Sequence, residues 1–309
     1  MTTSLVSFAT TEFEKYQHDL SRTAKTLGVQ RIFEYTKERD LLSTPFYREN
    51  MDLLDVPKGA GYWVWKPYFI LQALKQLKEG DILLYADAGT SFLSSFKPLV
   101  NLCQADSNGI LLFDMRPLLN REWTKRDCFI LLGADESRYW DAYQTMATVI
   151  VLKKSDFVIG FIQEWLKCCL VPLAVTSDAS LLGPEFKEFI EHRWDQSILS
   201  ILGIKYNLNT YRSPAKWGNY LKFPQFRRRN EYKGYPYALK DTIQDYAVEP
   251  QLNSPYGTIF EFNKRAQDLG HQPLTSDSSP KIFPLKHLVK YIAHTVAKIS
   301  QRAGFKDER

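Results

Sequence analysis

The segment Ile-Leu-Leu-Tyr-Ala-Asp-Ala-Gly-Thr-Ser-Phe, residues 82–92, decides the fold. Its first four residues form an uninterrupted apolar run of strand length, which is typical of a strand buried on both faces of a parallel sheet. The run leads to Asp87, and Ala88 and Gly89 follow with little side-chain bulk. Ligands of open α/β sheets bind at the carboxyl ends of the strands. The segment therefore predicts a buried strand whose end presents a carboxylate to a ligand.

Short apolar strands alternate with amphipathic helices around this segment. That alternation predicts an α/β fold, with a central, mainly parallel sheet flanked by helices on both faces. Asp114 follows a second apolar run and competes with Asp87 as the acid at a strand end. We expect strands at 5–9, 29–35, 82–85, 109–113 and 145–152, and helices at 13–27, 66–77, 99–104, 156–170 and 194–202.

The composition is that of an ordinary globular protein. Hydrophobic residues make up 44% of the 309 residues and charged residues 24%, which excludes the disordered, collagen-like and coiled-coil classes. The helix–strand pattern weakens after residue 205 without a sharp change of composition. From Pro284 onward, apolar residues recur on one helical stripe flanked by Lys and Arg. We expect one catalytic domain over 1–275 and a basic tail with an amphipathic helix over 276–309.

The charge distribution limits the partners. Residues 281–309 hold five Lys and two Arg against two acids, as large an excess as the chain's whole net charge of +5. No nucleic-acid-binding module is recognisable, so we expect no nucleic-acid partner. The N-terminus does not read as a signal peptide, no apolar run is long enough to span a membrane, and the four Cys lack metal spacing. We expect a cytoplasmic protein whose tail either docks on an anionic membrane surface or packs as an ordinary terminal helix.

Two Gly, two Trp, one Tyr and one Lys crowd the segment GAGYWVWKP at 59–67. Glycines allow close approach of a ligand, and aromatic rings can wall a pocket. Lys66 lies near the start of the expected helix, where a phosphate would also meet free backbone donors. Trp63 and Trp65 are either part of this binding site or core residues at strand-like spacing.

Two further segments carry charged side chains that suit the same chemistry. In EHRWDQSILSIL, residues 191–202, Asp195 is either a first-turn carboxylate that stabilises the helix or a base that takes a proton from a hydroxyl. In REWTKRDCF, residues 121–129, Lys125 and Arg126 either neutralise phosphate charge or begin a solvated helix.

The blocks GYWVWKP, YADAG, WTKRD and HRWDQS, in this order, resemble a group of bacterial and viral GT-A glycosyltransferases of polysaccharide (capsule or O-antigen) assembly. The resemblance covers roughly the N-terminal two thirds of the chain. It implies a GT-A, Rossmann-like nucleotide-sugar-binding fold and a donor site associated with a divalent metal.

The resemblance also implies roles for individual residues. Asp87 is the acid of a DxD-like motif and the metal ligand, with Mn²⁺ or Mg²⁺ as the ion. The second acidic position of that motif is Gly89, which leaves open whether a metal is required. The resemblance implies Asp195 as the catalytic residue, Gln196 near the acceptor and Lys66 as a donor-site cation. We add His192 as an expected acceptor- or sugar-binding residue, and Trp63, Trp65, Lys125 and Arg126 as expected donor-binding residues.

The expected activity is transfer of a hexosyl group from a nucleoside-diphosphate sugar, with uridine favoured, to a hydroxyl of a glycan or lipid-linked glycan. Asp195 as the single base predicts inversion at the anomeric carbon, and retention stays open. A nucleotidyltransferase would need a Gly-rich basic loop after its first strand, which SFATTEFEKY at 7–16 does not supply. A non-catalytic nucleotide-sugar or membrane-surface binding protein remains the alternative. His271 is either a late metal ligand or a structural residue.

Overall fold

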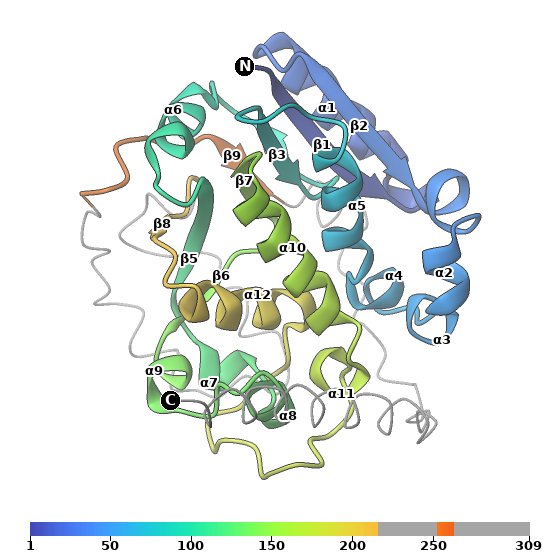
Figure 1. Cartoon of the computed structure of the whole chain (residues 1–309), viewed down its shortest axis with the longest axis vertical. Coiled ribbons are helices and arrows are strands. Elements are labelled where there is room, and N and C mark those ends of the chain that lie inside the picture. Colours follow the sequence, from blue (N-terminus) through green and yellow to red (C-terminus); the bar gives the residue numbers. More distant parts are fainter. Residues whose placement is uncertain (216–251, 263–309) are drawn as a thin grey trace, which may run out of the picture.

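The computed structural model describes residues 1–215 and 252–262 (Figure 1). The predicted tail helix, the expected domain boundary after residue 275 and His271 lie outside these ranges.

A seven-stranded sheet forms the centre of the molecule, in the order β2-β1-β3-β7-β5-β6, with β8 also paired to β5. Strands β1, β2 and β3 are parallel, β7 is antiparallel to both β3 and β5, β6 is antiparallel to β5, and β8 is parallel to β5. Five strands therefore run one way and two the other, which confirms the mainly parallel sheet. The bounds are β1 Thr3–Ala9, β2 Arg31–Thr36, β3 Ile82–Ala86, β5 Ile110–Leu119, β6 Tyr143–Thr145, β7 Val149–Lys153 and β8 Thr210–Arg212.

The single strand expected at 145–152 is wrong, because the chain forms two strands there. Strand β7 pairs with Ile110 and Leu111 of β5 and strand β6 pairs with Asp114 and Leu119, with the register shifted between them, so residues 146–148 form a connection rather than a strand. This connection lies at the edge of the sheet where β3 ends, since the amide of Asp87 donates to the carbonyl of Thr148 at 2.9 Å.

Helices cover both faces of the sheet. The longer ones are α1 Glu14–Thr26, α5 Trp65–Leu74, α6 Lys97–Ala105, α10 Asp156–Cys169 and α12 Trp194–Lys205, close to the expected ranges. The shorter elements are η1 Thr11–Phe13, η2 Lys37–Leu41, α2 Pro45–Glu49, α3 Met51–Leu54, α4 Gly59–Tyr62, α7 Asn120–Trp123, α8 Arg126–Leu131, α9 Ser137–Trp140 and α11 Pro172–Val175. In Figure 1, α10 lies in front of the sheet beside α5, and α12 crosses below it.

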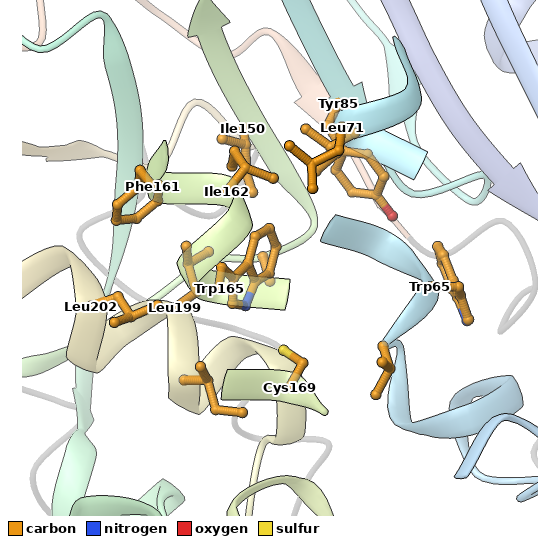
Figure 2. Packing of buried hydrophobic residues seen from close by; sticks show 14 of the residues in the cluster. Trp65, Leu71, Tyr85, Ile150, Phe161, Ile162, Trp165, Cys169, Leu199 and Leu202 are labelled. Atoms are coloured by element: carbon orange, nitrogen blue, oxygen red, sulfur yellow. The ribbon is translucent and has the colours of Figure 1, made fainter. Parts of the chain in front are cut away.

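The apolar strands are buried on both sides because successive side chains point to opposite faces. On β3, Leu83 and Tyr85 join the core that α5, α10 and α12 cover, whereas Ile82, Leu84 and Ala86 join the core beneath α1 and α6. Figure 2 shows the first core, where the tryptophan and phenylalanine of α10 lie beside the leucines of α12. Burying each large apolar side chain contributes about 1.5–3 kcal/mol.

A second, two-stranded sheet lies directly after the YADAG segment. It pairs β4 (Ser91–Phe92) with β9 (Phe260–Glu261) in antiparallel fashion. The 252–262 segment is also tied to β8, because the backbone amide of Arg212 donates to Ser254 Oγ at 2.9 Å. The 252–262 segment is thus anchored beside the carboxyl edge of the main sheet.

Across the two described ranges, no helix combines the length and the hydropathy needed to cross a membrane.

Candidate active site

The carboxyl ends of three parallel strands meet at one edge of the sheet. The register pairs Val6 with Tyr85 and Ala9 with Thr36, so β1, β2 and β3 end side by side. Asp87 follows β3 at this edge, as the sequence predicts. Open α/β sheets bind ligands at such an edge.

A buried ion cluster lies at this edge. The ammonium of Lys66, on α5, is 2.9 Å from Asp195 Oδ2 and 3.4 Å from Asp87 Oδ1, and it donates to the carbonyl of Ala147 at 3.1 Å. Lys66 is only 2% exposed. The structure therefore joins three residues that the sequence singled out in three separate segments, and we call Lys66, Asp87 and Asp195 the charge cluster.

Burial and charge act against each other in this cluster. Burial alone would lower the pKa of Lys66, but Asp195 and Asp87 outweigh that effect and raise it, so the ammonium stays charged. Burial raises the pKa of Asp195 to about 6, although Lys66 opposes the shift. Asp195 Oδ2 accepts no well-aligned hydrogen bond from the described residues, so its contact with Lys66 is an ion pair. A carboxyl group with a pKa near 6 can exchange a proton close to neutral pH.

The two carboxylates differ in their access to solvent. The side chain of Asp87 is 30% exposed and that of Asp195 only 4%. Asp87 Oδ1 accepts a hydrogen bond from the Tyr85 hydroxyl at 2.5 Å, in addition to its ion pair with Lys66. Burial, followed by the charge of Asp87, raises the pKa of Tyr85 well above its usual value, so the hydroxyl stays a donor. Both contacts are made by Oδ1 of Asp87.

The donor set suits a cation that arrives together with phosphate oxygens. Asp87 can offer one carboxylate oxygen and Gly89 offers none, and the described ranges contain no group of three or more His, Cys, Asp or Glu able to hold a metal ion. Mg²⁺ is commonly bound through one or two carboxylates, with substrate phosphates and water completing the shell. One ammonium against two carboxylates also leaves a negative charge uncompensated, so a diphosphate at this edge needs a further cation. The residues present therefore fit a divalent cation at Asp87.

Asp114, the competing acid, is not open in the same way. It is 7% exposed and forms an ion pair with Arg116 Nε at 2.9 Å. On β5 it pairs with Thr145 on one side and Arg212 on the other. Asp87 is thus the more accessible of the two carboxylates.

Gln196 belongs to a largely buried polar network that holds the connection at residues 146–148. Its Oε1 accepts from the amide of Ala147 at 3.4 Å, and its Nε2 donates to Gln144 Oε1 at 3.0 Å. Gln144 in turn donates to Asn120 Oδ1 at 2.8 Å and to Thr124 Oγ1 at 2.9 Å. The network places the Ala147 carbonyl against Lys66. Sequence reasoning missed Gln144, which no local pattern distinguishes.

The two tryptophans of the GAGYWVWKP segment lie in different surroundings. Trp65 is 5% exposed and its ring stacks on that of Phe8, with ring centroids 4.0 Å apart. Its indole N–H donates to the carbonyl of Gly59 at 3.0 Å, so Trp65 is a core residue. Trp63 is half-buried and packs against Trp194 with ring centroids 5.0 Å apart. Lys66 turns to the two carboxylates rather than standing free at the start of α5.

Lys125 and His192 are buried among backbone groups. Lys125 Nζ donates to the carbonyls of Asp178 at 2.9 Å and Thr176 at 3.4 Å, and the Lys125 amide lies 3.3 Å from His192 Nδ1. Burial and the charge of Lys125 lower the pKa of His192 well below its usual value, so the ring is neutral. Its Nε2 donates to the carbonyl of Ala174 at 2.9 Å. These contacts hold the chain after α11 rather than reaching the charge cluster.

Arg126 is also engaged away from the charge cluster. Its guanidinium pairs with Asp135 at 2.8 Å and lies over the rings of Phe186 at 4.7 Å and Trp140 at 5.2 Å. Phosphate neutralisation by Arg126 would need these contacts to change.

Comparison with known proteins finds similar structures but no similar sequences. No protein-family model matches the chain, and no curated protein matches its sequence. Its solved structural relatives include a glycosyltransferase involved in glycosylation of the major capsid of PBCV-1, with 11% identity over 54% of this chain and 66% of that one (TM-score 0.32). Mouse xyloside xylosyltransferase 1 is 9% identical over 86% and 98% of the two chains (TM-score 0.45). The galactosyltransferase LgtC, in complex with donor and acceptor sugar analogs, is 11% identical over 94% and 95% (TM-score 0.40).

Proposed function

We propose that this chain is a GT-A-type glycosyltransferase that moves a hexosyl group from a nucleoside-diphosphate sugar, with uridine favoured, to a hydroxyl of a glycan or lipid-linked glycan. The observation that carries the proposal is the charge cluster at the carboxyl edge of the sheet. It combines a partly exposed carboxylate that can hold a phosphate-bound cation with a buried carboxyl group whose pKa is about 6. A metal-dependent, inverting glycosyl transfer uses both, one for the leaving diphosphate and one for the acceptor proton.

Asp87 forms the donor half of the proposed site. A divalent cation bound there with the diphosphate would neutralise the charge that develops on the leaving group. Tyr85 and Lys66 fix the carboxylate in place by binding its Oδ1. The nucleotide would lie across the strand ends, where the chain turns after Ala9 and Thr36.

Asp195 forms the acceptor half. Asp195 is 4% exposed, so binding of the acceptor must first uncover its carboxylate. The acceptor hydroxyl then gives its proton to the Asp195 carboxylate as its oxygen bonds to the anomeric carbon, and the bond from that carbon to the diphosphate breaks, with its electron pair passing to the diphosphate. A single base on the side opposite the leaving group gives inversion. Lys66 keeps Asp195 ionised by opposing the effect of its burial. Gln196, the next residue, holds the segment that carries the Ala147 carbonyl.

The biological setting forms a second part of the proposal. The basic residues of 281–309 suit an anionic membrane surface on the cytoplasmic side, where a lipid-linked acceptor of a capsule or O-antigen type would be found.

A turnover assay tests the proposed activity. We expect purified protein to release a nucleoside diphosphate from one member of a panel of nucleoside-diphosphate sugars, faster with Mn²⁺ than with chelator and faster again with a hydroxyl acceptor. Release of the diphosphate also separates an enzyme from a protein that only binds nucleotide sugars. Consumption of none of the sugars, with or without metal, would contradict the proposal.

A further inference from the structure

The residues before Lys66 form a left-handed helical turn. All five residues of 59–63 have positive φ, from 49° at Ala60 to 98° at Gly61. Glycine adopts this conformation freely, but Tyr62 (φ 53°) and Trp63 (φ 59°) do so at a cost in free energy. Such strain persists only where the surroundings hold it, and it is common at functional sites.

Close packing and hydrogen bonds hold this turn. The amide of Gly61 donates to the carbonyl of Val56 at 2.8 Å, and the amide of Tyr62 donates to the carbonyl of Lys58 at 2.7 Å. A Cβ atom on Gly59 would lie 2.2 Å from the ring of Trp63, so the glycine backbone packs directly on that ring. The turn and the Trp63 ring therefore fix each other.

A second strained residue packs against the turn from a distant part of the sequence. Trp194 has φ 48°, and its ring lies 5.0 Å from that of Trp63. The ammonium of Lys58 lies over the Trp194 ring at 4.4 Å, and the indole N–H donates to Ser177 Oγ at 2.9 Å. Two strained tryptophans, 131 positions apart in the sequence, thus support one another.

Each of these tryptophans is joined directly to one member of the charge cluster. The carbonyl of Trp63 accepts the backbone N–H of Lys66 at 2.9 Å. Trp194 immediately precedes Asp195, whose carbonyl accepts from the Trp165 indole at 2.9 Å. A shift of either ring would move the backbone that carries Lys66 or Asp195.

We infer that the 59–63 turn and the Trp63–Trp194 contact form a brace that positions Lys66 against Asp195. Trp63 is a positioning residue in this account, not a sugar-stacking wall, since Gly59 and Trp194 already pack on its ring. The catalytic meaning of the brace rests on the proposed function, whereas its effect on Lys66 does not.

Chemical labelling of lysines tests the brace without any activity. Full-length wild type and Trp63→Ala are treated with acetic anhydride, and the acetylation of each lysine is followed by mass spectrometry. We expect Lys66 to be labelled at least about tenfold faster in the variant, because local opening exposes the ammonium. Trp63→Phe, which keeps an aromatic ring, should restore most of the protection.

Lys125 reports global unfolding, because it is 1% exposed and donates to backbone carbonyls. It should stay protected in every variant. If Trp63→Ala exposes both lysines by unfolding, Trp63→Leu, which keeps apolar volume without the ring, takes its place in the comparison. Trp140→Ala, which removes a half-buried tryptophan that contacts Phe186, should leave Lys66 protected. Equal labelling of Lys66 in wild type and in the folded Trp63 variants would overturn the inference.

Kinetics then distinguish positioning from simple support of the fold. Once the donor is known, we expect Trp63→Ala to lower kcat by about 10²-fold with little change in KM for the donor, since small misplacements of reacting groups have effects of this size. An unchanged kcat in a variant with exposed Lys66 would remove the positioning role. A wild type without turnover contradicts the proposed function instead and leaves the labelling result standing.

Discussion

Replacing Asp195 with Asn is expected to lower kcat by about 10³-fold while Kd for the nucleoside diphosphate stays close to that of wild type. Loss of a general base typically removes 10²–10⁴-fold of the rate. The amide keeps the shape of the side chain but cannot accept the proton, and Asp87 remains to pair with Lys66. Single-turnover kinetics with a saturating donor, together with calorimetry of diphosphate binding, measure the two quantities separately.

The pH profile shows whether Asp195 acts as the base. Only its ionised form can take a proton, so kcat/KM of the wild type should fall with an apparent pKa of about 6 as the pH is lowered. In Asp195→Asn this acidic limb should disappear from the residual rate. If Asp195 served only to hold Lys66, the variant would lose little activity and would keep the same limb. That pattern would contradict the assignment.

Replacing Lys66 with Met is expected to lower the free energy of unfolding by about 3–5 kcal/mol at neutral pH, because it leaves a buried carboxylate without its partner. Lys66 is 2% exposed and is 2.9 Å from Asp195, so water cannot replace the lost ammonium without local opening. Urea denaturation followed by tryptophan fluorescence measures the change.

The loss of unfolding free energy in Lys66→Met should become smaller as the pH is lowered. The pKa of Asp195 is already raised by burial and would rise further without Lys66, so the folded variant takes up a proton at higher pH than the unfolded chain does. Lowering the pH through this range stabilises the variant relative to wild type, and the difference between them should shrink as the pH falls towards about 6, where Asp195 of the wild type also takes up its proton. Lys125→Met is the matched control, since its ammonium is held by backbone carbonyls and its loss should depend less on pH. A pH-independent loss in Lys66→Met would contradict the ion pair.

Runs of apolar residues predict some strands of the sheet correctly and others not. The uninterrupted apolar run at 82–85 forms β3, because side chains on both faces of a central strand are buried. The run at 145–152 is also mostly apolar and β-branched in the sequence but is divided between two strands. That division depends on the shift in register along β5, which no local pattern shows.

The charge cluster could be predicted only in part. Strand-end position points to Asp87, and the start of a helix points to Lys66 and Asp195, but their mutual contacts are long-range and depend on the complete fold. A period of two places Tyr85 on the same side of its strand as Asp87, so this residue could have been found. The sequence does not show which charged residues are buried. It predicts Lys125, for example, at a phosphate site or on a solvated helix, but the side chain of Lys125 is buried at 1% exposure.

The left-handed turn at 59–63 could be predicted only at its glycines. Gly59 and Gly61 signal a backbone that needs positive φ. Ala60, Tyr62 and Trp63 carry no such signal and are held in this conformation by packing from other segments. The position of Trp65 could not be predicted from local sequence either. Its spacing from Trp63 is that of a strand, whereas Trp65 is the first residue of helix α5.

The central claim is that Asp87 holds the diphosphate of a donor through a divalent cation. Calorimetric titration with a panel of nucleoside diphosphates, with and without Mn²⁺, tests it in wild type, Asp87→Asn and the control Asp114→Asn. The account predicts that one diphosphate binds with Mn²⁺ and more weakly with chelator, that Asp87→Asn weakens binding by more than about tenfold, or about 1.4 kcal/mol, and that Asp114→Asn does not. Absence of binding by every diphosphate, or equal binding by wild type and Asp87→Asn, would contradict it.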